Sequence, residues 1–279
     1  MHRKRLVILI SVVAILLLAV ITALSKERMP GTSGGLKEKE MDAPQVQLLE
    51  KTMDAEESSY RVGVTLPGTD FSVIGQILSE KIEQEWETFD SLTREQQLAS
   101  SKLWGMVGVQ TNTWQACEAA IGFAVYNPLE SLDWLGKTGY FGMDSINPDM
   151  PARHILATAV TSTVDRTLRE IHVTAGYNNG SVRITLAAML ASDTGTATTG
   201  SVSSGYADYT QYSTTTKTGI PVLVVVTNQS NNTGYYNGEF CDLTAYWVME
   251  NVFYSLRVFG EKTDQTEIQR TLDRILQEI

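Results

Sequence analysis

Residues that commonly build metal centres and nucleophilic sites are scarce in this sequence. Its 279 residues include three histidines and two cysteines. His154 and His172 are the histidines outside the N-terminal segment, and they show neither a His-x-Glu nor a His-x₃-His spacing. A zinc centre would need further ligands that the sequence does not place beside them. We therefore expect no metal site and no cofactor, and we interpret His172 as a structural histidine.

Two cysteines are also too few for a disulfide-stabilised scaffold. Cys117 and Cys241 lie in the apolar segments WQACEAAIGF and GEFCDLTAYW. They are the candidate partners of a single disulfide, and two buried free thiols are the alternative. A catalytic thiol is disfavoured because so few histidines are present to activate it.

Positive charge is in short supply as well. The chain has 22 Lys and Arg, of which three precede residue 6, so 19 remain after residue 25 against 32 Asp and Glu, a net charge of −13. Binding of phosphate backbones needs clustered Lys and Arg, and no basic stripe follows Arg28. The charge excludes nucleic acid as a partner and is typical of a soluble exported domain.

Complete catalytic motifs are lacking too. Gly136-Lys137-Thr138 matches the end of a phosphate loop, but Ser131 stands where that motif needs glycine. Lys-Thr-Gly occurs at 137–139 and 217–219 without the Ser-x-x-Lys pair that penicillin-interacting enzymes require. We expect no catalytic residue among the local motifs. A site assembled in space from distant residues stays open as an alternative.

A long uncharged apolar run, Leu6–Leu24, is the clearest feature that is present. Its nineteen residues would form a helix of roughly 28 Å, close to the roughly 30 Å hydrocarbon core of a bilayer. Three basic residues precede it, which predicts a cytoplasmic N-terminus. We expect a single-pass anchor with the remaining chain outside. The alternative is a signal cleaved near Ala23-Leu24-Ser25, which would give a secreted protein.

Four regions follow from this interpretation. Residues 1–5 form a cytoplasmic stub, 6–24 the transmembrane anchor, 25–58 a flexible tether, and 59–279 one extracytoplasmic domain. The tether begins with the charged, Gly-rich stretch SKERMPGTSGGLKEKEMDAPQ, which has too few apolar residues to fold. A short helix at residues 46–53 is the one regular element that we expect in it.

Helical periodicity marks the start and the end of the domain. Apolar residues recur with helical spacing from Ile74 to Phe89, with Asp70 as the expected N-cap. Further helices are expected at 114–121 and 129–135. The C-terminal segment has an apolar face, and Asp264 with Glu267 predicts a capping box; that face comprises Ile268, Leu272, Ile275, Leu276 and Ile279.

Strand patterns occupy the sequence between these helices. Residues 154–164 and 167–177 are rich in β-branched residues, and Asn179-Gly180 predicts a hairpin. The apolar run at 220–228 predicts a strand covered on both faces, and 242–260 predicts a hairpin that turns at Glu250-Asn251. The pattern indicates an α+β fold: an antiparallel sheet meander flanked by N-terminal helices and a C-terminal amphipathic helix, after one transmembrane helix.

The stretch 192–216 is dominated by Ser, Thr and Gly, with tyrosines at 206, 209 and 212. Tyr206, Tyr209 and Tyr212 are our candidate binding residues, because tyrosines on a polar loop are typical of recognition surfaces. The alternative is that this stretch is a disordered insertion or an edge strand. We favour this alternative over a binding role.

Residues 114–130 (WQACEAAIGFAVYNPLE) and 245–276 resemble two segments of a group of uncharacterised bacterial exported domains. Such domains form the outer parts of membrane-anchored anti-sigma factors and of proposed lipoproteins in Gram-positive bacteria. The resemblance covers 49 residues and implies no functional residue. Only Met1–Arg5 precede the apolar run, so we do not expect sequestration of a sigma factor in the cytoplasm.

These features together predict a membrane-tethered extracytoplasmic binding or sensory domain without catalytic activity. Its partner would be an envelope protein or a small ligand. The alternative function is an extracytoplasmic, hydrolase-like enzyme whose site has no local motif.

Overall fold

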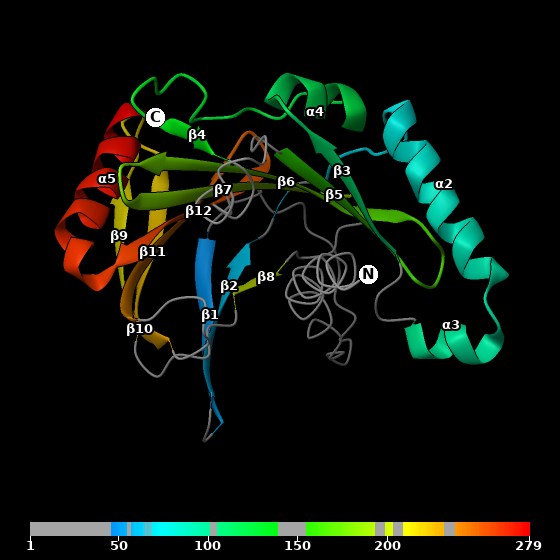
Figure 1. The fold of residues 1–279 in the computed structure, drawn as a ribbon, viewed down its shortest axis with the longest axis horizontal. Coiled ribbons are helices and arrows are strands. Elements are labelled where there is room, and N and C mark those ends of the chain that lie inside the picture. The colour runs from blue at the N-terminus through cyan, green and yellow to red at the C-terminus, as the bar shows by residue number, and fades with distance from the viewer. Residues whose placement is uncertain are drawn as a thin grey trace, which may run out of the picture.

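The computed structural model describes residues 46–54, 57–64, 66, 68–100, 105–138, 155–192, 199–202, 209–231 and 238–279. These residues form a large antiparallel sheet with helices on one face and a small sheet on the other (Figure 1). The prediction of an α+β fold with a large antiparallel sheet and a C-terminal helix is confirmed. The predicted anchor at 6–24 and residues 25–45 of the predicted tether (25–58) lie outside the described residues. In the described part of the chain, no helix is both long and apolar enough to cross a bilayer.

The large sheet has nine strands within the described residues, in the order β3-β5-β6-β7-β12-β11-β10-β9, with β4 also paired to β6. The strands run in two meanders, β5 to β7 and β9 to β12, which are joined by the pairing of β7 with β12. Their bounds are β3 Met106–Thr111, β4 Gly136–Thr138, β5 Ile155–Thr161, β6 Leu168–Asn179, β7 Val182–Ala191, β9 Tyr209–Thr215, β10 Pro221–Asn231, β11 Gly238–Met249 and β12 Val252–Glu261.

Two tight turns fix the register of the long hairpins. Asn179 pairs with Val182, so Gly180 and Ser181 form the two-residue loop, and Gly180 has a positive φ of 60°. Glu250 and Asn251 connect β11 to β12 with φ values of 50° and 65°. Two successive positive φ values define a type I′ turn, whose twist matches that of the strands. The turn at Glu250-Asn251 was predicted at this position, whereas the other turn was predicted at Asn179-Gly180 and lies one residue later.

The helices cover one face of the large sheet. α5 (Gln265–Glu278) packs on β11 and β12, whereas α4 (Trp114–Ile121) packs on β3 and β5 with α2 (Gln76–Ser91) beside it. The described residues also form two short helices, α3 (Arg94–Ser100), which lies beyond the end of α2 in Figure 1, and η2 (Lys262–Asp264). Alternate residues of the strands point into the main core, as Ile171, Val173 and Ala175 of β6 do.

A small sheet of β1 (Val46–Asp54), β2 (Glu57–Val64) and β8 (Thr199–Val202) lies on the opposite face. It forms a second apolar cluster with the large sheet, in which Val62 and Val64 join Tyr246 and Phe253. β10 supplies Val224 to the main core and Val225 to this second cluster. The apolar run at 220–228 is therefore a strand with both faces covered, as predicted.

Several local predictions differ from the structure. Residues 46–53 form strand β1 rather than a short helix, because they pair along β2. Residues 129–135 form turns, not a helix. α2 begins after Gly75, and Asp70 instead accepts a hydrogen bond from the backbone N–H of Ser72 at 2.8 Å. Strand β3 and helix α3 were not predicted.

The predicted capping box of the C-terminal helix is also absent. Asp264 stands at the N-cap but makes no side-chain cap hydrogen bond. Its carboxylate accepts a hydrogen bond from the Ser181 hydroxyl at 2.8 Å, while Glu267 pairs with Arg270. The apolar face of the helix is buried as predicted, because α5 lies flat on the sheet.

Candidate functional site

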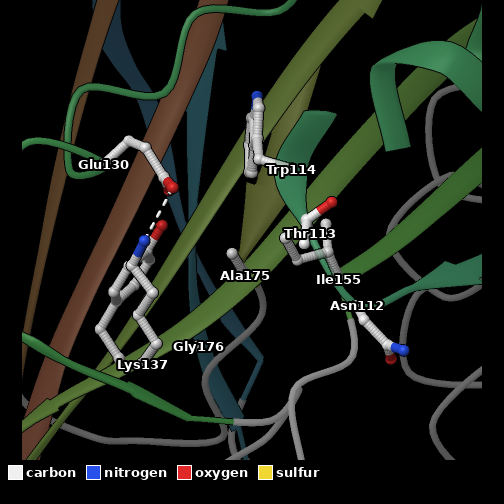
Figure 2. Close-up of a pocket in the computed structure, with 9 residues that line it drawn as sticks. Asn112, Thr113, Trp114, Glu130, Lys137, Ile155, Ala175 and Gly176 are labelled. Atoms are coloured by element: carbon white, nitrogen blue, oxygen red, sulfur yellow. Dashed lines mark hydrogen bonds and ion pairs between the residues drawn. The ribbon is translucent and has the colours of Figure 1, made fainter. Parts of the chain in front are cut away.

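A pocket of about 140 Å³ opens where the start of α4, strand β4 and the C-terminal half of β6 meet. Its volume is close to that of a cavity that holds one benzene ring, roughly 150 Å³. Figure 2 shows Glu130 and Lys137 on one side, and Trp114, Thr113 and Ile155 on the other. The pocket is lined by Asn112, Thr113, Trp114, Glu130, Lys137, Ile155, Ala175, Gly176 and Tyr177.

Regular structure positions several of these side chains. Lys137 of β4 lies opposite Tyr177 of β6 in the strand register, which brings two polar residues 40 positions apart together. Thr113 is the N-cap of α4, and its hydroxyl accepts from the Ala116 N–H at 3.1 Å. Trp114 follows in the first turn, where its indole N–H donates to the carbonyl of Val125.

Asn127 is buried and holds the polar side of the pocket together. Its amide nitrogen donates to the Tyr177 hydroxyl at 2.8 Å and to Glu130 Oε2 at 3.2 Å. Its amide oxygen accepts from the N–H of Leu129 at 3.0 Å. Lys137 Nζ donates to Glu130 Oε1 at 2.7 Å. Four side chains from three segments thus form one connected hydrogen-bond network, which restricts their rotamers.

The network combines two buried side chains, Asn127 and Tyr177, with two that reach solvent. Burial of the Tyr177 side chain raises the pKa of its hydroxyl to about 12, although the hydrogen bond from Asn127 opposes that rise. The hydroxyl therefore stays protonated at neutral pH. Glu130 and Lys137 have side chains that are 52% and 45% exposed, so a ligand that enters from solvent can reach both.

This arrangement is suited to binding a small polar molecule. The Lys137 ammonium has three N–H donors and uses one on Glu130, whose two oxygens can accept further hydrogen bonds. Trp114, Ile155 and Ala175 supply an apolar wall opposite this pair. Pockets with an apolar lining and a few fixed polar groups are the usual form of ligand sites.

Metal ligation has no comparable arrangement in the described part of the chain. No group of three His, Cys, Asp or Glu side chains lies close enough there to hold an ion. His172 makes a 2.8 Å contact with Glu170, and both side chains are about one-fifth exposed on the sheet face opposite the main core. His154 lies outside the described residues.

The structure separates the predicted tyrosines. Tyr206 lies outside the described residues, whereas Tyr209 and Tyr212 belong to the edge strand β9. Residues three apart in a strand point to opposite faces. Tyr209 packs against the second apolar cluster, and the Tyr212 hydroxyl accepts from Gln269 Nε2 of α5 at 2.9 Å. They do not share a surface, and neither lines the pocket.

Cys117 and Cys241 are buried free thiols in the structure. Cys117 belongs to α4, which packs on β3 and β5, and Cys241 belongs to β11. β5 and β11 are four strands apart along the sheet, about 19 Å at ~4.8 Å per strand, whereas a disulfide needs Cα atoms within about 7 Å. Burial raises the pKa of the Cys117 thiol to about 11, so it is protonated and unreactive at neutral pH.

Sequence reasoning missed the residues of the pocket. Lys137 was considered only as part of an incomplete phosphate loop and of a Lys-Thr-Gly motif, and Asn127 was not singled out. Tyr177 lies 50 residues from Asn127, and its position in a strand pattern predicts a core residue. No local signal joins these segments, because the pairing of β4 with β6 brings them together.

Comparison of the chain with protein-family models, with curated proteins and with solved structures finds no match in any of the three.

Proposed function

We propose that the chain is a membrane-anchored extracytoplasmic domain that binds a small polar ligand in the pocket beside Glu130 and Lys137. The observation that carries this proposal is the polar network, in which Asn127 fixes Tyr177 and Glu130 before any ligand arrives. Groups that are already held in place lose little conformational entropy on binding, so such a site favours affinity.

The shape of the pocket supports a ligand with one polar and one apolar side. The Glu130–Lys137 pair offers donors and acceptors on one wall, and the opposite wall is apolar. Neutral monosaccharides and aliphatic amino acids have this character, and so does the polar end of a larger envelope molecule. The cavity accommodates about one ring of such a ligand.

The proposed location rests on the sequence. The uncharged run Leu6–Leu24 is long enough to span a bilayer, and the basic residues before it favour a cytoplasmic N-terminus. The proposed arrangement places a tether between this helix and β1, with N-terminal helices α2 to α4 flanking the sheet. The resemblance to the outer domains of anti-sigma factors is consistent with an outer binding role.

Ligand binding is tested by thermal unfolding of the full-length chain with a panel of monosaccharides, aliphatic amino acids and short dicarboxylates. We expect at least one compound class to raise the unfolding temperature in proportion to the logarithm of its concentration. Lys137→Met should abolish that shift. The matched control is Arg270→Met, which removes a similar exposed ion pair on α5 and should keep the shift.

Three outcomes would contradict the binding function or relocate it. If no compound shifts the transition, small-ligand binding at this pocket is rejected. A shift that survives Lys137→Met places the ligand elsewhere. Conversion of a bound compound into a product, followed by nuclear magnetic resonance, would replace the binding function by an enzymatic one.

The anchor is tested separately by fractionation of cells that express the full-length chain or a form starting at Ser25. We expect only the full-length chain to stay with membranes after a high-salt wash, and protease added outside to digest its folded domain. Release of a shortened full-length product into the medium would show cleavage of the N-terminal segment instead.

A further inference from the structure

The two edges of the large sheet differ in how they are protected. At one end α2 packs beside the edge strand β3. At the other end β9 terminates the strand order, and among the described residues no element pairs with its outer side. Gln211, Ser213 and Thr215 are exposed there. Within the part of the chain that the structure describes, β9 is therefore an open edge.

The register of β9 shows which backbone groups face outward. Thr215 lies opposite Pro221, which has no N–H, so this pair is of the non-hydrogen-bonded type. The next residue, Thr216, donates its N–H to Ile220 across the turn at 2.9 Å. Because the direction alternates along a strand, Ser213 and Gln211 also direct their N–H and C=O groups away from β10.

The strand carries none of the usual devices that block an open edge. Its sequence, YTQYSTT, contains no charge and no proline, and its register with β10 is continuous over all seven residues. Natural edge strands are commonly protected by charges, prolines or bulges. An edge without them, with outward hydrogen-bonding groups, is a template for another strand.

We propose that β9 pairs antiparallel with β9 of a second copy of this chain, around a two-fold axis at Tyr212. In this register Gln211 of one copy lies opposite Ser213 of the other, so that their outward-facing backbone N–H and C=O groups can hydrogen-bond to each other. The two Tyr212 residues form a non-hydrogen-bonded pair on the face that carries α5, where such pairs bring side chains close.

Charge favours a second copy as the occupant. The chain has a net charge of −10, and helix α2 has five acidic residues against one lysine, so two copies repel each other overall and at surfaces such as α2. β9 has no charge, so two copies can meet there without that repulsion. A two-fold interface also needs a self-complementary patch, and a strand that pairs antiparallel with itself provides one.

The size of the contact predicts a weak dimer. Seven residues at ~3.4 Å each give a paired length of about 24 Å, which alone buries less than the roughly 1,200 Å² of a stable interface. If both copies are anchored in one membrane, as proposed above, their effective concentration rises and the dimer is favoured. The pairing geometry itself does not depend on the anchor.

Cysteine cross-linking tests this register. The full-length chain with Tyr212→Cys is oxidised in membrane vesicles, and also as purified protein at high concentration. We expect a disulfide-linked dimer, because the two positions lie opposite each other. Thr214→Cys should not cross-link, because its two copies are four residues apart in this register. Val164→Cys, an 83% exposed position on the β5–β6 turn, controls for random collision.

Two second-site variants test whether the backbone edge is responsible. Ser213→Pro removes an N–H that makes no bond to β10, so folding should persist while dimer formation falls by roughly tenfold. Ser213→Lys leaves the backbone intact and should have the same effect through like charges. Each is combined with Tyr212→Cys, and the urea midpoint of the monomer verifies that it is folded.

Several results would overturn the proposal. Equal cross-linking at 212, 214 and 164, or none at 212 in either preparation, excludes the two-fold pairing. Cross-linking that persists with folded Ser213→Pro and Ser213→Lys excludes the backbone edge. Capture of a different protein by the cysteine at 212 would show that the edge serves a partner other than a second copy. None of these results bears on ligand binding at the Glu130–Lys137 pocket.

Discussion

Replacement of Asn127 by alanine is the sharpest single test of the polar network. Asn127 is buried, and its side chain makes three hydrogen bonds, to the Leu129 N–H, the Tyr177 hydroxyl and Glu130. Leu129 and Tyr177 are themselves buried. Asn127→Ala therefore leaves a donor and a hydroxyl without their partner, in a place that water reaches poorly.

The expected cost follows from these contacts. Each hydrogen bond contributes about 1 kcal/mol net, and a stranded buried group costs about 1–3 kcal/mol. We expect Asn127→Ala to lower the free energy of unfolding by about 3 kcal/mol. Tyr177→Phe removes one of these bonds and should cost about 1 kcal/mol. The double variant should cost about 3 kcal/mol rather than 4, a coupling of about 1 kcal/mol.

Urea unfolding of the full-length protein, followed by tryptophan fluorescence, gives the free energy of unfolding for each member of this double-mutant cycle: the wild type, the two single variants and the double variant. Asn112→Ala is the matched control, because Asn112 also lines the pocket but is exposed, and it should change stability by less than about 0.5 kcal/mol. A loss below about 1 kcal/mol for Asn127→Ala, or strict additivity with Tyr177→Phe, would refute the network as drawn.

Three further predictions concern the backbone and the pH dependence. Gly122→Ala should lower the free energy of unfolding by about 3 kcal/mol or more, because the φ of Gly122 is 94° and a Cβ would lie 2.3 Å from the Gly75 backbone nitrogen. Gly180→Ala should lower it by only about 1 kcal/mol, because Gly180 has a φ of 60° but open space around it. Equal urea midpoints for the two variants would contradict this. The folded-state pKa of Tyr177, about 12, lies above its ordinary value of 10, so the stabilisation that it provides is complete below pH 10 and is lost between pH 10 and 12. Tyr177→Phe should lose less stability than the wild type over that range in urea titrations, and identical pH profiles would exclude the assignment. Glu250→Asn should raise the free energy of unfolding by about 0.5–1 kcal/mol, because asparagine tolerates the positive φ of 50° in this type I′ turn better than glutamate; an unchanged urea midpoint would show that the turn is not strained.

The sequence determined the elements whose signal is local. The hairpins at Gly180-Ser181 and Glu250-Asn251 follow from turn residues between β-branched runs, and α4 occupies the predicted range 114–121. The buried face of α5 could be predicted because its apolar residues recur every three to four positions, which places them on one side of a helix that packs on a core. Short-range periodicity and turn chemistry suffice for such elements.

Predictions failed where a distant contact overrides the local pattern. Residues 46–53 have apolar spacing compatible with a helix, but pairing with β2 makes them a strand. Asp264 has the position of a capping residue, but its carboxylate accepts a hydrogen bond from the Ser181 hydroxyl of the β6–β7 turn instead. A side chain of this kind can hydrogen-bond to either a local or a distant partner, and the sequence alone does not show which of the two it binds.

The candidate site and the open edge were decided by tertiary structure alone. Pairing of β4 with β6 brings Lys137 beside Tyr177, and the turn at Asn127 carries Glu130 to them. The sheet order leaves β9 at the end, with Tyr209 and Tyr212 on opposite faces. The sequence alone indicated most of the strands and helices of the domain, because propensity and periodicity act over a few residues. Which strands become neighbours, and hence which side chains meet, depends on burying two apolar clusters at once, and only the folded chain decides that.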